Sequence, residues 1–99
     1  MSMLTSTFDP AEHIEIDNPE FIQQYLEVML DENGIEGLQR ALGHTAKAKG
    51  MSQIAKDTNL GRESLYKSLS ESGKPKLETI DKVLKSFGVE LSIKQIAIN

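Results

Sequence analysis

The stretch "NLGRESLYKSL", residues 59–69, separates two kinds of side chain on the opposite sides of a short helix. Leu65 and Leu69 form the apolar side, and the other side carries Arg62, Glu63, Tyr66 and Lys67. Arginine can pair bidentately with guanine, and glutamate can accept a hydrogen bond from cytosine N4, so a helix of this kind fits the major groove of DNA. We therefore predict that these four polar residues contact DNA bases.

Short or basic hydrogen-bond donors surround this helix in the sequence. Such donors hold a protein on the phosphate backbone without reading the base sequence. We predict phosphate contacts from Ser52, Gln53, Lys56, Ser64, Ser68 and Lys74. Because this supply is modest, binding should rely on two half-sites, and we expect a homodimer.

Residues that could support catalysis or metal binding are scarce. The chain has no cysteine, and His13 and His44 are too far apart in the sequence and too poorly accompanied to suggest a metal site or a general base. Ser64 has no adjacent base, and there is no glycine-rich phosphate loop. We expect no enzyme activity, no metal and no cofactor, and we expect His44 to be exposed near a helix end.

Charge is distributed unevenly along the chain, whose formal net charge is -4. Residues 1–36 carry nine acidic residues and no lysine or arginine, whereas residues 47–76 carry seven bases and three acids. This pattern favours two partners of opposite sign, of which one would be DNA. Solvated helix faces that bind nothing remain the alternative interpretation.

The elements that would position these residues are helices separated by glycine and proline. We predict five, over about residues 19–32, 35–49, 53–58, 62–70 and 77–87, with Asn18 and Ser52 as N-caps and Asn59 as a left-handed C-cap. The fifth has the clearest amphipathic pattern, formed by Leu77, Ile80, Val83, Leu84 and Phe87. The two short helices joined by a tight turn match a helix-turn-helix at residues 51–70.

The segment "VELSIK" that follows alternates apolar and polar residues, which predicts a half-buried strand. The predicted organisation is therefore an all-α domain over residues 18–88, preceded by an arm at 1–17 and followed by a strand or tail at 89–99. A chain of 99 residues fits one domain. It shows no signal peptide and no membrane span, and we expect a cytoplasmic protein.

Three stretches together resemble the HigA-like addiction-module antidote family, which includes many prophage-encoded helix-turn-helix proteins. They are "FDPAEH" at residues 8–13, "NPEFIQQYLEVML" at 18–30, and the run from "ALGHTAKAKG" through "RESLYKSLSESGKP" to "LKSFGVEL", so that the resemblance covers about residues 8–91. It implies a λ-repressor-like five-helix domain that acts as the antitoxin of a type II toxin–antitoxin pair. Residues 62–64, 66 and 67 would then form the recognition helix.

Antidotes of this family neutralise a small basic toxin, commonly RelE/ParE-like, and repress their own operon as dimers, which would account for both charge zones. We predict toxin contacts at Phe8, Asp9 and Glu12 in the opening signature and at Phe21 and Tyr25 in the first helix. Phe21, Tyr25 and Met29 could instead belong to the core. Two other functions stay open: a stand-alone prophage-type transcriptional regulator, and a protein-interaction module that does not bind DNA.

Overall fold

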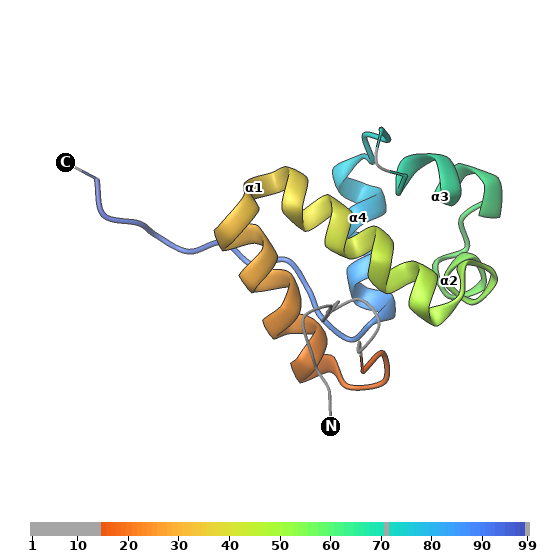
Figure 1. The fold of residues 1–99 in the computed structure, drawn as a ribbon, viewed down its shortest axis with the longest axis horizontal. Helices are drawn as coiled ribbons and strands as arrows, with labels where there is room; N and C mark the ends of the chain where they lie inside the picture. Colours follow the sequence, from red (N-terminus) through yellow and green to blue (C-terminus); the bar gives the residue numbers. More distant parts are fainter. Residues whose placement is uncertain (1–14, 71, 99) are drawn as a thin grey trace, which may run out of the picture.

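The computed structural model describes residues 15–70 and 72–98 and contains four helices in those ranges (Figure 1). They are α1 (Pro19–Lys49), α2 (Met51–Thr58), α3 (Arg62–Ser68) and α4 (Leu77–Ser86). The all-helical class agrees with the sequence prediction. The predicted arm at residues 1–17 lies mostly outside the described residues.

The prediction of five helices was wrong in number, because residues 19–49 form one helical element that bends at Gly34. Gly34 has φ 71° and ψ -161°, which no helical residue adopts and which is nearly exclusive to glycine. The predicted interruption at "NG" therefore exists, but the backbone resumes its helix at once. Figure 1 shows the first half of α1 turning sharply into the second.

The helix ends follow local chemistry. Asn18 Oδ1 accepts hydrogen bonds from the backbone N–H groups of Glu20 (3.1 Å) and Phe21 (3.3 Å), which satisfies two of the unpaired donors at the start of α1. Asn59 ends α2 in the left-handed conformation, as predicted. Ser52 is not an N-cap: α2 begins at Met51, two residues earlier than predicted, and the capping position is Gly50, where φ is 107°.

One hydrophobic core joins all four helices, and α2 packs against each of the other three. Ile22 and Leu42 of α1, Ile54 of α2, Leu65 of α3 and Val83 of α4 are almost completely buried. The predicted pattern of the last helix holds from Ile80 to Phe87, but Leu77 is 69% exposed because it is the first residue of α4.

The predicted strand after α4 does not form. Val89 packs against the core, and its N–H donates to the carbonyl of Leu84. Residues 90–98 form no strand pairing within the described chain. Their trace passes behind the first half of α1 and then leads away from the helices (Figure 1). A strand needs a neighbour with free backbone groups, and none of the described residues offers one.

Candidate functional site

Helix α3 exposes the four residues predicted to contact bases. Arg62, Glu63, Tyr66 and Lys67 all face solvent, while Leu65 between them is 1% exposed and fixes the rotation of the helix on the core. The Arg62 guanidinium lies over the Tyr66 ring, 5.6 Å from its centroid, and Tyr66 remains 46% exposed. This cation–π contact holds two of the four side chains together on the surface.

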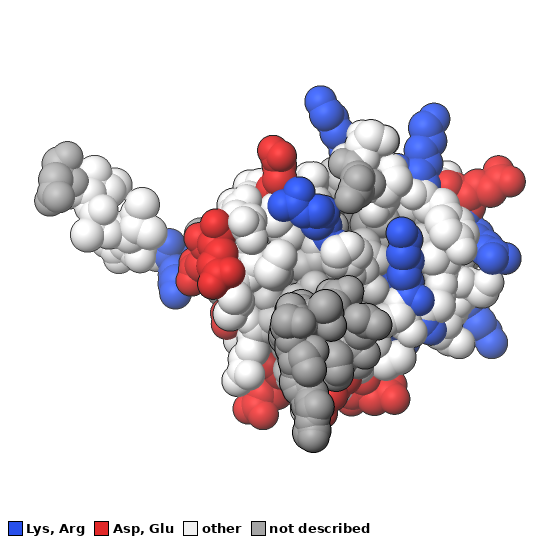
Figure 2. All heavy atoms as spheres, viewed as in Figure 1, with Lys and Arg blue, Asp and Glu red and all other residues white. Residues whose placement is uncertain are grey.

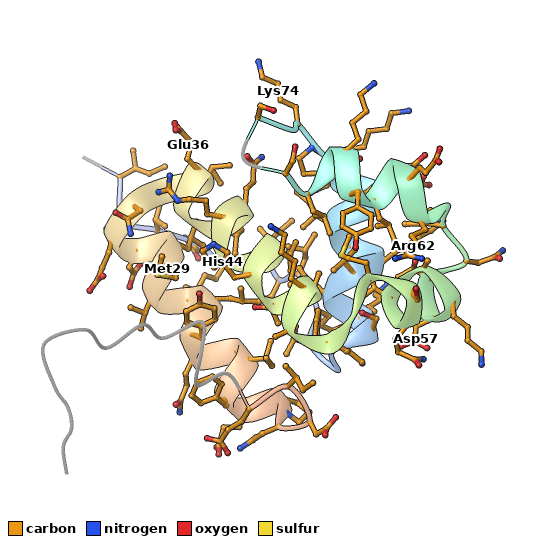
Figure 3. All side chains as sticks on the ribbon, turned by 45° about the vertical axis from the view of Figure 1, so that its right-hand side comes forward. Met29, Glu36, His44, Asp57, Arg62 and Lys74 are labelled. Atoms are coloured by element: carbon orange, nitrogen blue, oxygen red, sulfur yellow. The ribbon has the colours of Figure 1, made fainter. Side chains whose placement is uncertain are left out.

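The predicted phosphate-contacting residues are spread over α2, α3 and the loop before α4. Ser52, Gln53 and Lys56 are exposed on α2, Ser64 is exposed on α3, Ser68 is half-buried, and Lys74 is exposed in the loop (Figure 3). Gln53 Nε2 donates to Asp57 Oδ1 at 2.8 Å, so this amide is already engaged within the chain. The structure brings Ser52 close to the base-contact set and leaves Lys74 at a distance from Arg62 (Figure 3).

A shallow open depression of about 500 Å³ links the start of α2 to the exposed side of α3. It is lined by Lys47, Gly50, Met51, Ser52, Arg62 and Tyr66. A second depression, of about 450 Å³, shares Lys47 and is lined by Arg40, Gly43, His44, Leu69, Ser70 and Ser72. None of the described lining residues is acidic, so the two depressions form one neutral-to-basic surface through Lys47.

The sequence analysis missed the contribution of α1 to this surface. Arg40, His44 and Lys47 lie at i, i+4 and i+7, which places them on one side of a helix, and this spacing was a readable signal. All three side chains are exposed. Gly43 allows the approach of α3: a Cβ atom there would lie 2.6 Å from the carbonyl oxygen of Leu69.

Lys49 is a base of the same segment with a different environment. Its Nζ donates to the carbonyl oxygen of Ser86 at 2.9 Å and lies 3.6 Å from Asp57 Oδ2. It also sits 5.0 Å from the centroid of the Phe87 ring. Lys49 therefore joins the end of α1 to α2 and α4, and its charge is less available to an external anion than that of Lys47.

The first half of α1 and the residues before it form an acidic surface. Its members are all exposed: Glu15, Asp17, Glu20, Glu27, Asp31, Glu32 and Glu36. No salt bridge within the described residues involves any of them. Figures 2 and 3 show acidic residues, including Glu36, at the α1 end, while lysine and arginine, including Arg62, gather toward α2 and α3.

Apolar side chains lie beside these acids. On the helical projection Glu20, Glu27 and Asp31 form one row, and Phe21, Tyr25 and Val28 form the adjacent row. The rings of Phe21 and Tyr25 stack with centroids 6.4 Å apart, both are partly buried, and Val28 is 49% exposed. The predicted toxin contacts Phe8, Asp9 and Glu12 lie outside the described residues.

Other kinds of site have little support in the described ranges. His44 is exposed, as expected, and His13 lies outside the described residues. Across residues 15–70 and 72–98, no group of three or more histidine, aspartate or glutamate side chains is arranged to hold a metal ion. Within the same ranges, no helix has the length and apolar character needed to cross a membrane.

Comparison with known proteins shows the family to which the chain belongs. No solved structure matches the chain significantly. An uncharacterised protein of Haemophilus influenzae is 44% identical over 88 residues, a match that covers 89% of each chain. Residues 4–95 match the sequence profile of a family described as "Probable addiction module antidote protein". The chain therefore belongs to this family of addiction-module antidotes.

Proposed function

We propose that the protein is the antitoxin of a type II toxin–antitoxin module and that it represses its own operon. In this proposal α2 and α3 form a helix-turn-helix that binds operator DNA, and the protein acts in the cytoplasm as a homodimer. The acidic surface of α1 binds a small basic toxin of the RelE/ParE-like class. No enzyme activity, metal or cofactor is part of the proposal.

The observation that carries the DNA-binding half is the exposed side of α3 and what borders it. Arg62, Glu63, Tyr66 and Lys67 are free of the core, and the adjoining depressions add Lys47 and Arg40 without an acidic neighbour among the described lining residues. Base-reading side chains on a short helix, flanked by cations that can face phosphates, are the arrangement that this kind of recognition needs. The net charge of -4 is a weak argument against DNA binding, because most of the acidic residues lie at the end of the molecule formed by the first half of α1, away from α3.

The acidic surface supports the toxin-binding half. Seven exposed carboxylates within residues 15–36, with no lysine or arginine among them, attract a basic partner over distance. The neighbouring row of Phe21, Tyr25 and Val28 supplies apolar area that such a partner can bury. An antidote implies a cognate toxin, and the two rows together match a basic protein better than they match DNA.

The test is a double dissociation between the two surfaces. The Arg62→Ala/Lys67→Ala variant and the Glu27→Lys/Asp31→Lys variant are compared with the wild type on two ligands. One ligand is a fluorescent fragment of the gene's own upstream DNA, measured against a scrambled fragment across a salt series. The other is the small basic protein encoded by an adjacent reading frame.

We expect the first variant to lose at least about 30-fold in affinity for the upstream DNA and to keep its toxin affinity, since a bidentate base contact is worth about 1–3 kcal/mol. The second variant should lose about tenfold or more in toxin affinity and keep DNA binding, since exposed charge pairs contribute up to about 1 kcal/mol each. Wild-type protein that does not prefer its upstream DNA would refute the repressor and favour an interaction module. Specific DNA binding without any toxin would favour a stand-alone regulator.

A further inference from the structure

The segment after α4 exposes more apolar surface than its length would suggest. Leu91, Ile93, Ile96 and Ile98 are four of the nine large hydrophobic residues that are exposed in the described chain. Ile93 is 99% exposed and Ile98 is 86% exposed. Isolated apolar residues on a surface are ordinary, but four within eight consecutive residues make this segment a candidate interaction site.

The backbone of residues 90–98 is available for pairing with another strand. In the part of the chain that the structure describes, no backbone hydrogen bond engages residues 90–98. Val89, Leu91 and Ile93 alternate with Glu90, Ser92 and Lys94, which is the pattern of a strand with one apolar face. An extended segment of this kind is a template for pairing with another strand.

We propose that residues 89–95 of two copies of this chain pair as antiparallel strands around a two-fold axis at Ser92. In that register each residue faces the residue of the other copy that lies equally far from Ser92 on the opposite side. Glu90 of each copy faces Lys94 of the other, which gives two opposite-charge pairs on one face of the ribbon. Leu91 faces Ile93 twice on the other face, which is the face that Val89 continues toward the core.

This self-complementarity is the reason to choose a second copy as the occupant. Glu90 and Lys94 are the only charged residues within 89–98, so the segment has no net charge with which to select a basic toxin. The segment is instead complementary in charge to a second copy that runs in the opposite direction, because Glu90 of one copy then faces Lys94 of the other. A two-fold interface requires this property, because each position meets its symmetry partner in the opposite direction.

The proposal gives a structure to the homodimer of the proposed function, but its test needs neither DNA nor toxin. The chain has no cysteine, so a Ser92→Cys variant has one thiol per copy. At the centre of an antiparallel pair the two Cα atoms lie about 4.5–5.5 Å apart, within the range that a disulfide spans. Gln95→Cys is the matched control, because its two Cα atoms would lie about 20 Å apart, six residues along the strands.

We expect Ser92→Cys to form an intermolecular disulfide under mild oxidation at least about tenfold faster than Gln95→Cys. Equal rates, or a faster reaction of the control, would overturn the register. Non-reducing electrophoresis of a time course gives both rates. The comparison does not depend on whether either variant is less stable, provided that circular dichroism shows both to be folded.

Charge exchange supplies a second readout. Glu90→Lys and Lys94→Glu should each weaken dimerisation measurably in sedimentation equilibrium, because like charges then face each other twice, and the double variant should restore it. Failure of the double variant to restore dimerisation would refute the pairing. A dimer that cross-links at position 92 but ignores its upstream DNA would refute the proposed function and support this inference, and specific DNA binding without that cross-link would do the reverse.

Discussion

The acidic half of α1 and the α2–α3 end of the molecule carry opposite charges in different environments. The carboxylates of residues 15–36 are exposed and form no salt bridge within the described chain. At the other end, Arg62 lies over Tyr66, Gln53 and Lys49 contact Asp57, and Lys49 is held on α4. The acidic surface is therefore one field of like charge, whereas at the α2–α3 end Arg62, Gln53 and Lys49 are each engaged in a specific contact within the chain.

This difference fits two modes of recognition. A field of like charge attracts an oppositely charged protein and raises its association rate without fixing a single geometry. Positioned side chains suit a ligand with a regular array of acceptors, such as base edges and phosphates. The net charge of -4 is the sum of two unlike surfaces, and neither can be inferred from it.

Gly34 bends α1 close to the end of the acidic surface, and its substitution should give the largest effect. We expect Gly34→Ala to lower the free energy of unfolding by about 1–3 kcal/mol, because an alanine would be forced to φ 71° and ψ -161°. Thermal unfolding followed by circular dichroism measures the change. Glu36→Ala, at an exposed helical position two residues away, is the control and should change little.

The sign of the stability change shows whether α1 is bent or straight at Gly34. In an uninterrupted helix, glycine is less favourable than alanine by about 0.5–1 kcal/mol, so the same substitution would then stabilise the protein. A Gly34→Ala variant with a higher melting temperature would mean that α1 is straight in solution. The first half of α1, which carries most of the acidic surface, would then point in a different direction from the one in Figure 1.

The sequence was sufficient for the all-helical class, for several helix ends and for the exposed side of α3, because these depend on local signals. Asn18, Asn59 and the spacing of Ile80, Val83 and Leu84 act over a few residues, and the structure has them as predicted. Alternation alone predicted a strand at residues 89–93, but a strand also needs a neighbour, which the alternating pattern does not contain.

The site was less predictable where residues distant in sequence meet. Lys49 and Ser86 are 37 positions apart, and nothing in the segment "KAKG" distinguishes Lys49 from Lys47. Their different roles come from the packing of α1 against α2 and α4. The contribution of Arg40 and His44 to the second depression likewise depends on the close approach of Leu69 to Gly43.

Lys47 and Lys49 allow an exposed lysine to be compared with one that is bound within the chain. We expect Lys49→Gln to lower the free energy of unfolding by about 1–2 kcal/mol, because it removes the charged donor to the Ser86 carbonyl oxygen. Lys47→Gln should leave stability unchanged and reduce the salt dependence of DNA binding by about one counterion. Urea unfolding and a salt titration of DNA affinity measure the two effects. A loss of stability in Lys47→Gln, with a change in the salt dependence of DNA binding in Lys49→Gln, would contradict the roles assigned to the two lysines.

The smallest expected effect concerns the start of the acidic surface. Asn18→Ala removes the side-chain oxygen that accepts from the N–H groups of Glu20 and Phe21, and it should cost about 1 kcal/mol, or about 4–8 °C in Tm. Asn18→Asp keeps an acceptor oxygen and should remain close to the wild type, although the added charge lies among other acids. Because the first turn of α1 carries Phe21, loss of the cap should also weaken toxin binding slightly while DNA binding stays unchanged. If Asn18→Ala altered DNA binding at unchanged toxin affinity, the acidic surface and the α2–α3 surface could not be independent binding sites.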